Sequence, residues 1–242
     1  VKNEISKQYL NLGLYSATIE TKVTPQERNR VAIDFYINEG STARIKEVKI
    51  IGVTKFSEDD LLSRLDLKPT SFLSWWNKDD RYSRQVLTGD LEKIRSFYMD
   101  RGYLDFDIEN TTVSISETKK NVYIVIVIDE GDKYNFGDIK ISGNFYPLKE
   151  EEIFQSNIKT IKGDVFSRKL LNQSTESINQ ELGNYGYAFS NVNPIPDVDK
   201  NNLTVSFNYF IEPGKKVYVR RISFIGNEKT QDKVLRREMR QF

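Results

Sequence analysis

The segment Asn121–Asn144, NVYIVIVIDEGDKYNFGDIKISGN, decides how the chain is organised. Its apolar run Val122–Ile128 is typical of a buried central strand. The run stops at Asp129–Gly131, and a second apolar strand ends shortly afterwards at Gly143. This pattern indicates that one core closes at the acidic stop and that another core begins a few residues later.

The same feature occurs three times along the chain. In each case two glycines stand twelve positions apart, and a strand rich in Ile and Val precedes the second one: Gly40 and Gly52, Gly131 and Gly143, and Gly214 and Gly226. The repeat is longer than a solenoid unit of roughly 20–50 residues. Each repeat is therefore expected to be a small domain with its own core.

Periodicity predicts the order of elements within one repeat. A short helix follows Ser57, and a second helix starts after Ser83 and ends at Gly102. The next repeat places Ser167 and Gly186 at the same spacing. Two strands complete the repeat, and a change of apolar parity in the first of them predicts a β-bulge. The predicted fold class is α+β: tandem β-α-α-β-β domains, each a three-stranded mixed sheet covered by two helices, with the most apolar strand in the centre.

These signals predict four segments. Residues 1–40 hold the C-terminal part of a domain, and residues 41–131 and 132–214 are complete domains. Residues 215–242 hold the first strand and the first helix of a further domain. The start without Met and the end within a helical pattern favour a piece of a longer protein.

Composition excludes several kinds of site. The 242 residues contain no Cys and no His, which removes Cys/His zinc sites, thiol nucleophiles and Ser-His-Asp triads. The net charge of +1 argues against a dedicated nucleic-acid binder. No segment reaches the roughly 18 apolar residues of a membrane helix, and no carboxylate pair stands out as catalytic. We expect no enzyme activity, cofactor or metal.

Beyond these patterns, the sequence resembles a known family. The element order, the EG and GN junctions, and the strings GDLEKIRSFYMDRGY, SWWNKDDRYSRQ and VRRISFIGNEKTQDKVLRREMRQ are similar to the POTRA domains of outer-membrane β-barrel assembly factors. The resemblance covers the whole chain, from the end of a second POTRA domain through the third and fourth into the fifth. It implies a location at the periplasmic face of the outer membrane and a missing membrane barrel. The implied partners are unfolded outer-membrane precursors and lipoprotein subunits of the assembly complex.

The first candidate site is an open sheet edge. An unpaired edge strand can pair with an extended peptide of almost any sequence, which is called β-augmentation. The corresponding strand of the next domain carries Pro194 and Pro196, which remove donors. We therefore expect the open edge in domain 41–131, at Thr111, Thr112, Val113, Ser114, Ile115 and Ser116. An ordinary edge without a partner is the alternative.

Two further surfaces are candidates for partner binding. Trp75 and Trp76 lie between the two predicted helices of domain 41–131, where they either anchor a partner or fold back to pin their own loop. Near the C-terminus the predicted helix carries Arg236, Arg237, Glu238 and Arg240. The resemblance implies lipoprotein docking there, whereas a solvated charged face is the ordinary alternative.

Two other functions stay open at this point. A related outer-membrane translocation or secretion transporter also carries POTRA domains, usually fewer of them. A structural scaffold of the cell envelope or of division would join membrane proteins without handling precursors.

Overall fold

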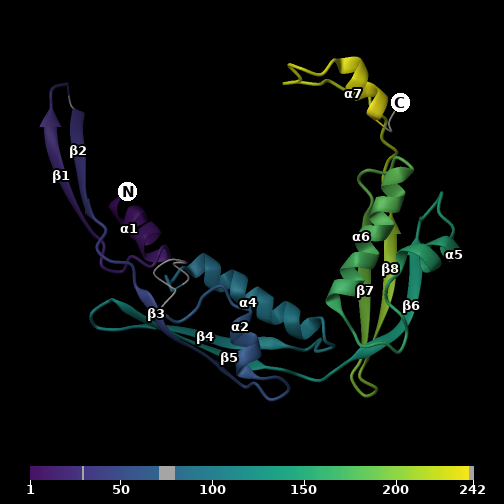
Figure 1. Cartoon of the computed structure of the whole chain (residues 1–242), viewed down its shortest axis with the longest axis horizontal. Coiled ribbons are helices and arrows are strands. Elements are labelled where there is room, and N and C mark those ends of the chain that lie inside the picture. Colours follow the sequence, from purple (N-terminus) through teal and green to yellow (C-terminus); the bar gives the residue numbers. More distant parts are fainter. Residues whose placement is uncertain (29, 71–79, 240–242) are drawn as a thin grey trace. The chain divides into compact units, whose positions relative to one another are not determined.

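A computed structural model of the chain describes residues 1–28, 30–70 and 80–239 (Figure 1). The chain divides into two compact units, Val1–Asn135 with Val165–Arg168 and Phe136–Asp164 with Lys169–Phe242.

The first unit opens with a partial domain. Helix α1 (Lys2–Asn11) is followed by the antiparallel strands β1 (Thr18–Gln26) and β2 (Arg30–Asn38). This is the second helix and the last two strands of the predicted repeat.

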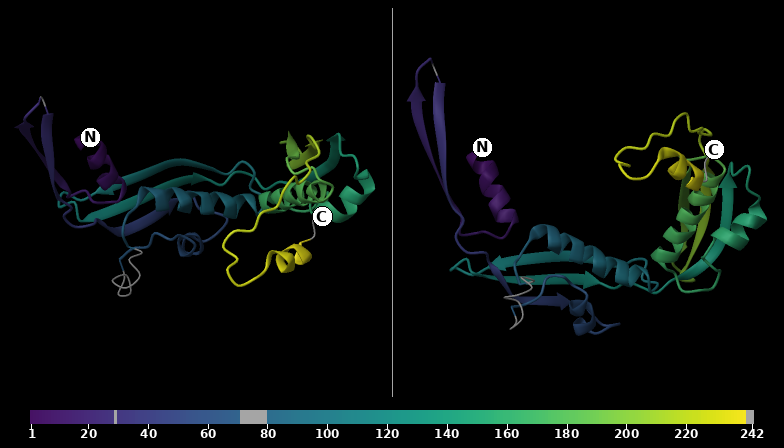
Figure 2. Two further views of the ribbon diagram at one scale, coloured as in Figure 1. Left: turned by 90° about the horizontal axis from the view of Figure 1, so that it is seen from above. Right: turned by 45° about the horizontal axis from the view of Figure 1, so that its top comes forward.

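A complete domain follows in the same unit. Its elements are β3 (Arg44–Ile51), α2 (Glu58–Ser63), α4 (Arg84–Met99), β4 (Asp107–Ile115) and β5 (Asn121–Asp129). The sheet order is β3-β5-β4, with β3 parallel and β4 antiparallel to the central strand β5. Figure 2 shows α4 running along this sheet. The predicted mixed sheet with the apolar strand in its centre is confirmed.

One face of the β3-β5-β4 sheet carries the core. Alternate side chains of β5 are buried, namely Val122, Ile124, Ile126 and Ile128. They belong to one cluster with Leu61 of α2 and Leu87 and Ile94 of α4. The predicted bulge is also present, because the β4–β5 register shifts between Ile108 and Asn110.

The second unit repeats this plan. Its elements are β6 (Asn135–Gly143), α5 (Glu150–Glu152), the π-helix η1 (Ile153–Asn157), α6 (Arg168–Asn184), β7 (Asn191–Asp199) and β8 (Thr204–Glu212). The sheet order is β6-β8-β7, so β8 is central and β7 lies at an edge. Buried residues of β8 and α6 include Phe207, Tyr209 and Ile178.

The predicted first strand of the last segment does not form. Helix α7 (Asp232–Glu238) is present, but residues 213–225 have no regular secondary structure. In the complete domain the first strand, β3, pairs with a strand some seventy residues later. Among the described residues no strand pairs with this segment, so its backbone groups join no ladder.

Glu130, the acidic residue at the opening motif, is buried and ties three parts of its domain together. Its carboxylate accepts hydrogen bonds from the backbone N–H groups of Thr54 and Lys55, each at 3.0 Å, and from the Thr54 hydroxyl. The Tyr98 hydroxyl of α4 donates a fourth at 2.8 Å. Burial alone would raise the pKa of Glu130, but these hydrogen bonds outweigh it and hold the pKa below its ordinary value. The end of β5 is thus joined to the turn after β3 and to α4.

We predict that Glu130→Gln lowers the free energy of unfolding of domain 41–131 by about 2 kcal/mol, because the buried Tyr98 hydroxyl and the donors of Thr54 and Lys55 lose a charged acceptor. Both tryptophans fall within this domain, so urea titration followed by tryptophan fluorescence reports on it. The matched control is Glu39→Gln, since Glu39 is exposed and accepts one hydrogen bond, from Tyr9. An equal loss in both variants would contradict the prediction.

The free energies of unfolding of the natural chain and of Glu130→Gln should differ less at acidic pH. The folded-state pKa of Glu130 is lowered, so its contribution is fully present above the ordinary value of 4.5 and is lost as the pH falls through the lower folded value. The stability difference between the natural chain and Glu130→Gln should therefore shrink below about pH 4.5. A difference that stays constant between pH 7 and pH 3 would refute this account.

Two glycines provide a second test of the fold. Gly102 has a φ of +104°, and a Cβ there would lie 2.9 Å from both Lys133 and Val165. Gly89 lies inside α4, and a Cβ at that position would have no other atom within 4 Å beyond its own helix turn. We expect Gly102→Ala to destabilise by about 1–3 kcal/mol and Gly89→Ala to stabilise by roughly 0.5–1 kcal/mol in the same urea titration. Changes of the same sign would show that the backbone of Gly102 is not constrained as described.

Candidate functional site

The two edges of the β3-β5-β4 sheet differ in how far their backbone groups are covered. On β3, the Ile45 N–H donates to the Asp80 carbonyl at 2.7 Å, and the Ile45 carbonyl accepts from the Thr70 N–H at 2.9 Å. Further along, the Ile50 N–H donates to the Glu58 carboxylate at 2.8 Å. Local segments therefore occupy backbone groups near both ends of the outer edge of β3. Among the described residues, no backbone group outside the sheet bonds to the outer edge of β4, so this edge can accept an added strand.

The register of the β4–β5 pair fixes which β4 residues face outward. The Ser116 N–H donates to the Asn121 carbonyl at 2.9 Å, just beyond the end of β4. Opposite residues of an antiparallel pair alternate between hydrogen-bonded and non-hydrogen-bonded positions. Ser114, opposite Tyr123, and Thr112, opposite Val125, therefore direct their backbone groups toward β5.

The outward backbone groups of β4 belong to Thr111, Val113 and Ile115. Half of the predicted edge residues thus present the N–H and C=O groups that another strand could use. Thr112 and Ser114 belong to the internal ladder, and Ser116 belongs to the turn. Sequence reasoning placed the strand at the edge, but it could not assign this parity.

The edge of the second sheet has a different character. In β7, Pro194 lies opposite Tyr209 and Pro196 lies opposite Phe207. Proline has no N–H, so β7 offers fewer donors along its length. The predicted contrast in strand binding between the two edges stays a prediction.

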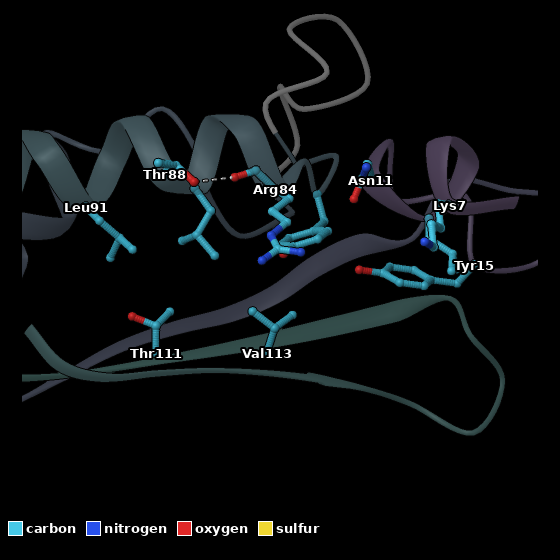
Figure 3. A pocket seen from close by; sticks show the side chains of 11 residues that line it. Lys7, Asn11, Tyr15, Arg84, Thr88, Leu91, Thr111 and Val113 are labelled. Carbon is cyan, nitrogen blue, oxygen red and sulfur yellow. Dashed lines mark hydrogen bonds between the residues drawn. The ribbon is translucent and has the colours of Figure 1, made fainter. Parts of the chain in front are cut away.

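A groove of about 760 Å³ lies beside β4 in the first unit (Figure 3). It is bounded by α4, by β4 and by the end of α1. Its lining residues are Lys7, Leu10, Asn11, Tyr15, Tyr82, Arg84, Leu87, Thr88, Leu91, Thr111 and Val113. Two of the outward-facing β4 residues, Thr111 and Val113, contribute side chains to this groove.

Two stacked tyrosines form part of the groove wall. The rings of Tyr15 and Tyr82 lie 6.1 Å apart between centroids at 29°. Burial, together with the neighbouring Tyr82, raises the pKa of Tyr15 to about 12. The phenol is therefore neutral at physiological pH, and the wall is apolar with polar tips.

The groove also carries two basic side chains, Lys7 and Arg84, and its lining contains no acidic residue. Sequence reasoning did not predict a role for either of them. They come from helices some seventy residues apart, and no local motif connects them.

The charged residues near the C-terminus contact one another. Arg236 donates to the Ile222 carbonyl at 3.0 Å, lies 5.3 Å from the Phe224 ring and pairs with Asp232 at 3.5 Å. Arg237 pairs with its neighbour Glu238 at 3.4 Å, and both side chains are largely exposed. Arg240, Trp75 and Trp76 lie outside the described residues.

Neither a metal centre nor a membrane helix accompanies these surfaces in the described part of the chain. Within residues 1–28, 30–70 and 80–239, no three His, Cys, Asp or Glu side chains are grouped to hold a metal ion. In the same ranges, no helix has the length and apolar character needed to cross a membrane.

Comparison with known proteins identifies three matching segments. The model of the POTRA family, described as a surface antigen variable number repeat, matches residues 1–40, 43–131 and 134–214. The outer membrane protein assembly factor BamA of Neisseria meningitidis serogroup B is 33% identical over 238 residues, which is 98% of this chain and 30% of that protein. BamA of Buchnera aphidicola is 33% identical over 235 residues, covering 96% of this chain and 37% of that protein. The chain thus spans about a third of these relatives.

A solved structure agrees with the fold. The crystal structure of Haemophilus influenzae BamA POTRA3-5 matches with a TM-score of 0.67 and 26% identity, covering 83% of this chain and 78% of that one. The tandem α+β architecture is therefore shared with a POTRA array.

The β4–β5 register predicts which proline substitutions in β4 destabilise the domain. Ile115→Pro removes an outward N–H and should change the free energy of unfolding by less than about 1 kcal/mol. Ser114→Pro removes a ladder hydrogen bond to β5 and should cost about 1–3 kcal/mol. Thermal unfolding by circular dichroism measures both, and a larger loss for Ile115→Pro would mean that the opposite parity faces outward.

Proposed function

The chain belongs to the POTRA family, and from this premise we propose that it is the periplasmic array of an outer-membrane β-barrel assembly factor that binds unfolded precursors by β-augmentation. The observation that carries the proposal is the open edge of β4, with outward backbone groups at Thr111, Val113 and Ile115. The names of the BamA relatives support the assembly role. A location at the periplasmic face of the outer membrane is part of the same proposal.

An edge of this kind suits precursors that differ in sequence. Backbone hydrogen bonds are available from any extended segment, so affinity does not depend on particular side chains. The covered β3 edge and the proline-bearing β7 edge would direct such segments to β4. The groove beside β4 provides apolar surface for alternate side chains of the added strand.

The proposal includes docking of lipoprotein subunits near α7. The exposed pair Arg237 and Glu238 supports it, because Arg236 is already occupied by contacts within its own segment. Glu238→Lys in the full-length protein should reduce recovery of lipoprotein subunits in co-purification. Unchanged recovery would remove α7 from the proposal.

Two alternatives are distinguishable from precursor binding. A translocation or secretion transporter would pass an extended chain through its own barrel, and an envelope scaffold would bind no unfolded segments. The matched relatives are named as assembly factors, which favours precursor binding in barrel assembly over both alternatives.

The β-augmentation step can be tested with dye-labelled extended peptides taken from outer-membrane barrel strands. The double variant Thr111→Pro/Ile115→Pro removes two outward donors and should weaken binding about tenfold, since each lost hydrogen bond contributes about 0.5–1.5 kcal/mol. The matched control Thr112→Val/Ser114→Val changes exposed side chains of the same strand but keeps every backbone donor. Fluorescence anisotropy measures the affinities.

The expected pattern is weaker binding for the proline variant and binding within about twofold of the natural chain for the control. Equal affinities for all three proteins, with the folds intact by circular dichroism, would rule out β4 as the binding edge.

A further inference from the structure

The groove beside β4 is ordered along its length from apolar to basic. Figure 3 shows Leu91 near Thr111 at one end, Arg84 above Val113, and Lys7 farther along beside Tyr15. Helix α4 therefore runs antiparallel to β4, which agrees with the pairing of Arg95 and Asp107 at 3.1 Å. Leu87 and Thr88 lie between the two ends.

The spacing of α4 matches that of an added strand. Alternate residues of a β-strand are roughly 6.6–6.8 Å apart, and one turn of an α-helix rises about 5.4 Å. Successive groove-facing residues of a strand paired to β4 would therefore meet successive turns of α4. They would meet Leu91 first, then Leu87 with Thr88, and then Arg84.

The basic end of the groove has positive charges without negatively charged partners among the described residues. Within the described residues, Lys7 and Arg84 are both exposed and make no ion pair, and the groove lining holds no carboxylate. Two unpaired cations beside an apolar wall favour an occupant that brings a negative charge to that end. The other end, at Leu91, favours an apolar side chain.

We propose that this groove selects extended segments in which three successive groove-facing residues, spaced two positions apart, are apolar, apolar and acidic. The acidic side chain lies at Lys7 and Arg84. The inference rests on the proposed edge function and adds a charge preference to it. Lys7 and Arg84 act as specificity determinants, while the backbone of β4 supplies the sequence-tolerant part of the binding.

Capped peptides provide the test, because acetylated and amidated ends remove the terminal charges. Two dye-labelled nonapeptides of alternating Val and Thr carry one Glu in a groove-facing position, near either the N-terminal or the C-terminal end. This covers both strand directions. Each has matched versions with Gln and with Lys in place of Glu, and anisotropy gives the affinities.

The natural chain should bind the Glu version of at least one peptide roughly fivefold to tenfold more tightly than its Lys version, with Gln between them. In Lys7→Glu/Arg84→Glu the order should reverse. The preference should weaken as salt rises from about 50 mM to about 500 mM, since both cations are exposed. The control Lys46→Glu/Lys49→Glu changes the net charge equally at exposed residues of β3 and should keep the natural order.

The outcomes distinguish the charge preference of the groove from β-augmentation at β4. Equal binding of Glu, Gln and Lys versions would overturn the charge preference and leave β-augmentation standing. The same order in the natural chain and in Lys7→Glu/Arg84→Glu would also overturn it. If no peptide binds at all, the edge function fails as well.

Discussion

The parallel pairing of β3 with β5 is the constraint on which the rest of domain 41–131 depends. A parallel pair cannot be joined by a tight turn, so the chain must make a long crossover, and here two helices provide it. The helices then cover one face of the sheet and bury the alternate side chains of β5. Because the first and last strands run side by side in the same direction, the chain enters at one end of the sheet and leaves at the other. A domain of this kind is readily repeated.

The same topology determines where an edge remains. With β5 in the centre, β4 and β3 both lie at margins, but only β3 has a crossover folded against it. Thr70, Asp80 and Glu58 all come from that crossover and occupy backbone groups of β3. The hairpin strand β4 has no crossover of its own. Among the described residues, no other strand pairs with its outer edge, and α4 forms a groove beside it.

Small differences separate domains that share this plan. In each domain a glycine follows the second helix. The residue four positions before this glycine is Tyr9 in the first domain, Tyr98 in the second and Leu182 in the third. The two tyrosines donate to Glu39 and Glu130, whereas leucine cannot donate to Glu212. The edge strands differ in the same way, since prolines occur in β7 and not in β4. The fold is thus maintained by the apolar pattern, while polar and backbone details differ from one domain to the next.

The sequence by itself determined the element order, the repeated domain plan, the bulge in β4 and the edge position of that strand. These features depend on signals within a few residues, namely apolar period, helix caps and glycines with positive φ such as Gly102. Only the tertiary structure decided which β4 residues face outward, that the β3 edge is covered, and that Lys7 and Arg84 share one groove. It also showed that residues 213–225 form no strand. Each of these depends on residues that lie far apart in the sequence, and local sequence carries no record of such contacts.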